Sequence, residues 1–174
     1  FFGAIYIALP HVFVLLFINI WAAILNLIAF FVILFTGRFP ESTFNFNVGL
    51  FRWSVRLNAS FYNLIDGYPQ IGVDGSHQDV TLEIPYPESV SRGKTLLRAF
   101  FGIFYVIMPH AFCLMFYGIW VMIQQMIAWW VVLFTGSYPE SMFRSIEGYM
   151  RWSLRVNLYM SHMTDEYPRF SGNE

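Results

Sequence analysis

The fold is decided by residues 1–36, FFGAIYIALPHVFVLLFINIWAAILNLIAFFVILFT, in which there is no Asp, Glu, Lys or Arg. Residues 99–134 form a second such stretch. A run of roughly 18 or more apolar residues is typical of a membrane segment, and helices of soluble proteins are seldom apolar on every face. Only 12% of the chain is charged, against about 25% in a soluble domain. The sequence therefore predicts an all-α membrane protein.

The second half of the chain repeats the first at an offset of 99 residues. Residues 1–69 align with residues 100–168 without a gap, and 32 of the 69 positions are identical. The shared strings are Pro-His, Ile-Trp, Leu-Phe-Thr-Gly, Pro-Glu-Ser, Arg-Trp-Ser-x-Arg-x-Asn and Tyr-Pro. Such self-similarity defines the structural unit. We expect two copies of one module, at 1–69 and 99–168, with a connector at 70–98 and a tail at 169–174.

Each apolar segment is too long for one straight crossing, since about 35 residues reach roughly 52 Å and the hydrocarbon core is about 30 Å thick. Near the middle, repeat 1 has Asn19 and repeat 2 has Gly118, which tolerate turn geometry. We predict that residues 1–36 and 99–135 each form a transmembrane or re-entrant helical hairpin, giving four membrane helices. Two crossings per repeat place all ten Lys and Arg residues on one side, which the positive-inside rule identifies as the cytoplasm.

An interfacial amphipathic helix is predicted after each hairpin, over residues 40–66 and 139–165. Each begins with Pro-Glu-Ser, and Pro and Glu favour the first turn of a helix. Apolar residues follow at helical spacing, and a crossing here would carry arginines into hydrocarbon. In the connector, alternating residues at 79–84 predict a short β-strand.

The Arg-Trp-Ser-x-Arg string places two guanidinium groups on one helix face in each repeat. Such pairs could clamp lipid phosphates or the carboxylates of a partner subunit. Alternatively, they are ordinary positive-inside residues, paired with Glu41, Asp66, Glu140 or Asp165 of their own repeat. The predicted lipid- or partner-binding residues are Arg52, Trp53, Arg56, Arg151, Trp152 and Arg155.

Pro10-His11 and Pro109-His110 lie inside the apolar segments, where proline is expected to kink the helix. The two histidines could be bis-histidine ligands of a haem or could bind a metal. Alternatively, each neutral imidazole bonds the backbone group that its proline neighbour leaves free. No Cys-x-x-Cys-His or His-Glu-x-x-His pattern occurs, and Cys113 is the single cysteine. We expect no metal and no cofactor, with haem as a weaker hypothesis.

Enzyme signatures are also missing, because the sequence has no Walker loop, no Gly-x-Gly-x-x-Gly and no Gly-x-Ser-x-Gly. A transporter needs polar groups at mid-membrane, where the repeats offer only Asn19, Asn26, Gln124 and Gln125. We therefore predict that the protein is not an enzyme and has no nucleic-acid partner.

The combined string of Pro-His, Phe-Thr-Gly-x-Phe/Tyr-Pro, Arg-Trp-x-x-Arg and Tyr-Pro resembles a bacterial family of small integral-membrane proteins, classed as a domain of unknown function. The resemblance implies the bacterial inner (cytoplasmic) membrane and transfers no catalytic residue. Residues 91–98 lead into repeat 2, and repeat 1 has no such lead-in. We expect the natural protein to have further residues before Phe1.

Aromatic residues make up 21% of the chain and provide large, rigid packing surfaces. The sequence predicts a non-catalytic accessory or scaffold subunit of an inner-membrane complex, which packs against partner helices and anionic lipid with its polar segments in the cytoplasm. The alternative is a stand-alone or homo-oligomeric module that binds or organises lipid. A weaker alternative is a passive transporter or pore subunit.

Overall fold

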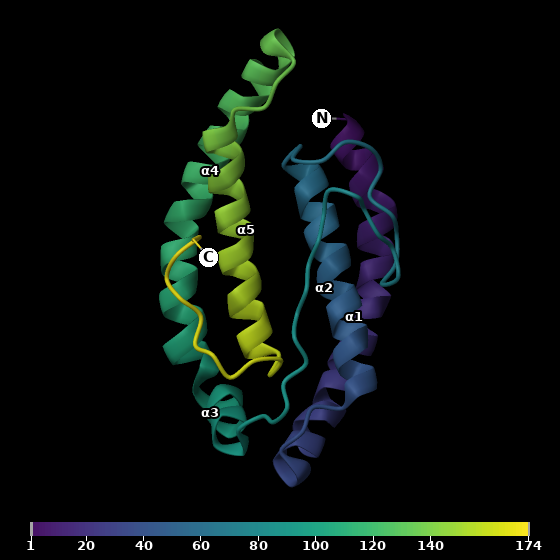
Figure 1. The fold of residues 1–174 in the computed structure, drawn as a ribbon, viewed down its shortest axis with the longest axis vertical. Coiled ribbons are helices and arrows are strands. Elements are labelled where there is room, and N and C mark those ends of the chain that lie inside the picture. The colour runs from purple at the N-terminus through teal and green to yellow at the C-terminus, as the bar shows by residue number, and fades with distance from the viewer. Residues whose placement is uncertain (1, 174) are drawn as a thin grey trace. The chain divides into compact units, whose positions relative to one another are not determined.

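The computed structural model describes residues 2–173. Its elements are α1 (Phe2–Thr36), α2 (Glu41–Phe61), α3 (Arg92–Gly102), the π-helical turn η1 (Ile103–Ile107), α4 (Met108–Thr135) and α5 (Glu140–Met160) (Figure 1). The chain divides into two compact units, unit 1 (Phe1–Thr95) and unit 2 (Leu96–Glu174). The predicted all-α class is confirmed for the described residues.

Two helical runs, Tyr6–Thr36 and Arg92–Thr135, are long and apolar enough to cross a membrane. The prediction of four membrane helices, from a hairpin within each apolar segment, is therefore wrong. Asn19 makes no turn, because its side-chain amide donates to the Leu15 carbonyl at 2.8 Å within α1. Gly118 lies inside α4, where an added Cβ would be 3.3 Å from the Tyr149 hydroxyl oxygen. This glycine makes room for the Tyr149 side chain of α5 and does not end α4.

The hairpin of each repeat is instead made of one apolar and one amphipathic helix. α2 runs antiparallel to α1, and α5 runs antiparallel to α4 (Figure 1). Gly37 and Gly136 begin the two connecting turns with φ angles of 72° and 71°, a left-handed conformation that glycine adopts without strain. Both amphipathic helices begin at the glutamate of Pro-Glu-Ser, within one residue of the predicted start.

The core of unit 1 lies between α1 and α2. The buried face of α1 contains small side chains, Ala22 and Ala29, which let the two helices approach closely. Trp53 and Leu57 are buried one turn apart on the same face of α2, and Phe44, near the start of this helix, packs against Phe39 and Tyr86. From Tyr6 to Thr36, most of the remaining surface of α1 is apolar and exposed or half-buried.

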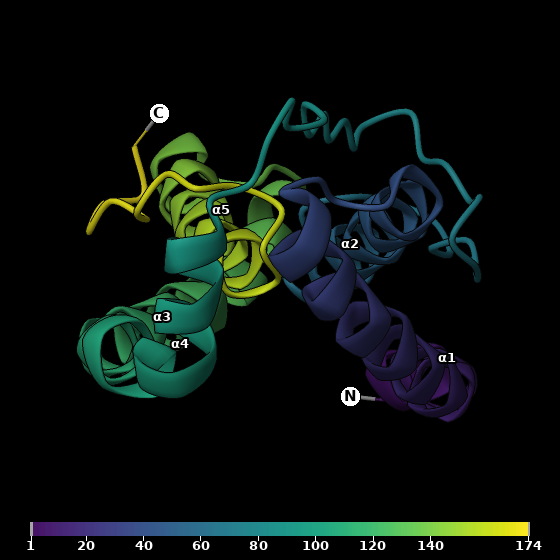
Figure 2. The ribbon, with the colours of Figure 1, turned by 90° about the horizontal axis from the view of Figure 1, so that it is seen from below.

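The segment after each amphipathic helix doubles back along it, which gives each unit three layers: apolar helix, amphipathic helix and extended chain (Figure 2). In unit 1 this connector ends at the α1 terminus, where the Val90 amide donates to the Gly37 carbonyl at 2.8 Å. The strand predicted at 79–84 is wrong, since the described residues form only an isolated antiparallel bridge between His77 and Val80. No second strand lies beside the segment, and a lone strand is not stable.

Candidate functional site

The two histidines each accept a hydrogen bond from a tryptophan of the same repeat. The Trp53 indole Nε1 donates to His11 Nδ1 at 2.7 Å. In unit 2, Trp152 Nε1 donates to His110 Nδ1 at 2.9 Å. All four side chains are buried. The repeated bond fixes the register of the apolar helix against the amphipathic one.

This geometry also determines the histidine tautomer. An indole N–H can only donate, so the acceptor Nδ1 carries no proton and a neutral imidazole has its proton on Nε2. Neither nitrogen then offers a free lone pair to iron, which disfavours the haem hypothesis for His11 and His110. Among residues 2–173, no group of three or more His, Cys, Asp or Glu side chains is placed to hold a metal ion.

The tyrosine of the Tyr-Pro string completes each cluster. The rings of Tyr68 and Tyr167 lie 5.4 Å, centroid to centroid, from His11 and His110 respectively. The Tyr167 hydroxyl also donates to the Tyr105 carbonyl at 2.8 Å.

That carbonyl lies four residues before Pro109, which has no N–H to donate to it, and the helix widens into η1 just before the proline. The tyrosine, and not the histidine as one alternative had it, therefore compensates the proline of repeat 2. The equivalent proline of repeat 1, Pro10, lies inside α1, which is α-helical on both sides of it.

Two of the four arginines that were predicted to bind lipid or a partner make hydrogen bonds to the backbone of their own repeat. Arg56 Nη2 donates to the Gly72 carbonyl at 2.8 Å, and Arg155 Nη2 donates to the equivalent Ser171 carbonyl. Burial lowers the pKa of both guanidinium groups below the ordinary arginine value, with smaller contributions from neighbouring arginines. These residues fasten the returning chain to the amphipathic helix.

A glycine in each amphipathic helix makes room for the returning chain. A Cβ on Gly49 would lie 2.7 Å from the Val73 carbonyl oxygen, and one on Gly148 would lie 3.3 Å from Gly172. Glycine inside a helix costs about 1 kcal/mol relative to alanine. Its presence at equivalent positions of both repeats was a usable sequence signal that our prediction missed.

The remaining arginine pair, Arg52 and Arg151, differs between the repeats. Arg151 bonds the Glu147 carboxylate one turn earlier at 2.8 Å. The equivalent of Glu147 in repeat 1 is Val48, and Arg52 instead donates through Nε to the Leu82 carbonyl at 2.9 Å. Within the described part of the chain, no carboxylate oxygen lies within 4.0 Å of Arg52 or Arg56.

Two of the four carboxylates that were proposed as arginine partners pair with other arginines. Glu140 binds Arg144, and Asp165 binds Arg98 of α3. Arg98 is buried and also donates to the Tyr159 and Thr164 carbonyls at 2.7 Å each. It thereby satisfies carbonyl groups at the C-terminal end of α5. Sequence reasoning missed Arg98, because the repeat alignment does not include it.

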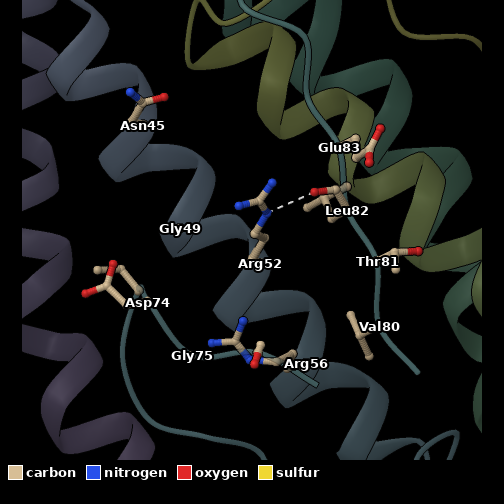
Figure 3. Close-up of a pocket in the computed structure, with 12 residues that line it drawn as sticks. Asn45, Gly49, Arg52, Arg56, Asp74, Gly75, Val80, Thr81, Leu82 and Glu83 are labelled. Atoms are coloured by element: carbon tan, nitrogen blue, oxygen red, sulfur yellow. Dashed lines mark hydrogen bonds between the residues drawn. The ribbon is translucent and has the colours of Figure 1, made fainter. Parts of the chain in front are cut away.

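Unit 1 contains a pocket of about 450 Å³ between α2 and the connector. Arg52 and Arg56 extend into it from α2, and the opposite wall is the extended chain around Gly75 and Thr81 (Figure 3). Trp53, which lies between the two arginines in sequence, does not line the pocket, and its side chain bonds His11 of α1 instead.

Comparison with known proteins places this architecture in one family. A family profile described as a domain of unknown function, DUF4389, matches residues 4–70 and 92–172. No curated protein and no solved structure is significantly similar to the chain. Since the two matches cover most of the sequence, the chain belongs to the DUF4389 family.

Proposed function

We propose that the chain is a non-catalytic accessory or scaffold protein of a bacterial inner membrane. The supporting observation is how each repeat uses its side chains. The polar groups of the shared strings are used inside the repeat, in the histidine–tryptophan and arginine–carbonyl bonds. From Tyr6 onward, the outer surface of α1 is largely apolar, as is that of α4, and both offer a large area for packing.

That apolar surface is extensive in both units. On α1, Phe13 and Phe17 are 64% and 57% exposed, and on α4, Phe116 and Met126 are 55% and 69% exposed. Patches of this size on a protein are covered by lipid, by another protein or by a further copy. Aromatic side chains give such contacts rigid, well-defined shapes.

The layers of each unit favour an orientation in the plane of the membrane. Arg52, Asp74 and Glu83 lie beside the middle of α2, which runs alongside α1. If α1 crossed the membrane perpendicularly, these charges would lie at hydrocarbon depth. The insertion free energy of a charged residue there is unfavourable by about 2.5–3.5 kcal/mol, even on the most lenient scale. An in-plane unit puts α1 among acyl chains, α2 at the headgroups and the connector in water. Both repeats then face the cytoplasm without any crossing.

The accessory role is tested by site-specific photo-crosslinking in cells, followed by native mass measurement after mild detergent extraction. A photoreactive residue at Phe116, on the apolar face, is expected to crosslink to a membrane protein or to a second copy. The same residue at Asn157, on the exposed face of α5, is the control and is expected to give little product. A monomer carrying only lipid adducts at Phe116 would contradict the role and favour the lipid-organising alternative.

A further inference from the structure

The pocket of unit 1 is a polar recess that the internal bonds of the repeat leave unexplained. It is formed where the connector passes over α2, and about 450 Å³ is enough for a small polar ligand. Its two cationic groups come from one face of α2, one helical turn apart.

Both arginines retain donor capacity in this pocket. Arg52 uses Nε for the Leu82 carbonyl, and its terminal nitrogens point away from that carbonyl (Figure 3). Arg56 is only 2% exposed, and its Nε has no hydrogen-bond partner. The Nε of Arg155, the equivalent residue of repeat 2, has no partner either, so the exposed Arg52 is the residue that distinguishes this pocket as a site for a ligand that accepts hydrogen bonds.

The charge around the arginines favours an anion. No carboxylate oxygen lies within 4.0 Å of either guanidinium in the described chain. Asp74 and Glu83 also line the pocket, but their carboxylates are turned away from the arginines (Figure 3). The hydroxyl groups of Ser76 and Thr81 provide further donors on the connector side.

Repeat 2 shows what a neutralised version of this face looks like. There Arg151 is bonded by Glu147, whereas the equivalent position in repeat 1 is the buried Val48. The same arginine is thus engaged by its own helix in one repeat and available in the other.

We infer that the unit 1 pocket binds a phosphate ester through Arg52 and Arg56. Paired guanidinium groups match the geometry of phosphate oxygens better than any other side chains do. The ester is either a phospholipid headgroup or a soluble phosphate monoester, and the chemistry of recognition is the same for both. This inference does not depend on the accessory role, which concerns the opposite, apolar surface.

The test uses the full chain purified in a neutral detergent. Glycerol 3-phosphate is titrated calorimetrically, and binding to phosphatidylcholine vesicles is measured with and without phosphatidylglycerol. Arg52→Gln is the test variant, because Arg52 is exposed and its loss leaves the core intact. Arg151→Gln is the matched control, since it removes the same charge from the equivalent position of repeat 2.

Arg52→Gln is expected to weaken binding roughly 10–100-fold, as for the loss of hydrogen bonds to a charged group, while Arg151→Gln stays near wild type. Loss of glycerol 3-phosphate binding would identify a soluble ester as the ligand. Loss of the phosphatidylglycerol dependence alone would identify a lipid headgroup. The inference is overturned if neither probe binds the wild-type chain, or if both variants behave alike. Unchanged thermal unfolding of Arg52→Gln confirms that the fold is intact.

Discussion

At the scale of single residues, the two histidine–tryptophan bonds tie each apolar helix to its amphipathic partner. Trp152→Phe keeps most of the packing but leaves His110 Nδ1 buried without its donor. We expect this variant to lose about 1–3 kcal/mol of unfolding free energy, measured by denaturation in detergent. Trp129→Phe, at an exposed position of α4, is the control and is expected to change little. Equal stability of the two variants would show that the bond contributes nothing.

A second residue-scale prediction concerns pH. Burial, and secondarily the charge of Arg98, lowers the pKa of His162 from 6.5 to about 4, while Asp165 acts in the opposite direction. As pH falls through this window, the unfolded chain takes up a proton before the folded chain does, so stability decreases. The loss reaches at most about 3 kcal/mol near pH 4.

Denaturation at pH 7.5 and at pH 5 measures this effect, and His162→Asn is the comparison. His162 has a φ of 62°, and its repeat counterpart, Asn63, has a φ of 52°. Asparagine therefore suits the backbone at position 162. We expect the variant to lose much of the pH dependence, and a slope equal to that of wild type would assign it to other groups.

At the scale of elements, the returning chain depends on the glycine beneath it. Gly49→Ala would bring a methyl group within 2.7 Å of the Val73 carbonyl oxygen, so the connector must shift. We expect faster proteolysis within residues 70–76 and an unfolding free energy lower by roughly 1–3 kcal/mol. Gly93→Ala in α3 has no atom within 4 Å of the added Cβ and is the control. A connector equally protected in both variants would contradict this account.

The elements also show what could be predicted from sequence. The starts of α2 and α5 were predictable because Pro-Glu-Ser carries a local helix signal. The hairpin prediction failed because an asparagine in an apolar segment does not require a turn: the Asn19 amide bonds the Leu15 carbonyl one turn earlier in a continuous helix. The strand at 79–84 failed for a different reason, since strand pairing depends on a distant partner.

The candidate site was predictable only in part. The repeat identified the histidines, tryptophans and arginines as important, but their partners lie far away in sequence. The bonded histidine and tryptophan are 42 positions apart, and the arginine ties span 16 positions. Spacing therefore suggested a surface clamp, whereas the buried Arg56 and the half-buried Arg155 each bond a carbonyl of the returning chain.

At the scale of the whole molecule, membrane orientation is the decisive property. Lys94 lies in the first turn of the long helical run Arg92–Thr135, and Ser137 follows its last residue. An in-plane unit keeps both ends on the cytoplasmic side, whereas a crossing separates them. Cysteines at these positions in a Cys113→Ala background, probed with an impermeant thiol reagent, are expected to be protected in intact cells and labelled after permeabilisation. Labelling of only one of them in intact cells would establish a crossing.

The difference between Val48 and Glu147 has a consequence for how the chain has diversified. Two copies of one module carry the same histidine–tryptophan and arginine–carbonyl bonds, and none of these bonds involves residue 48 or its counterpart. That position can therefore differ between the copies without breaking them. One copy keeps a self-neutralised arginine, and the other, through a single carboxylate-to-valine difference, leaves the arginine available. The two halves thus share these internal bonds and differ in the charge that each leaves available.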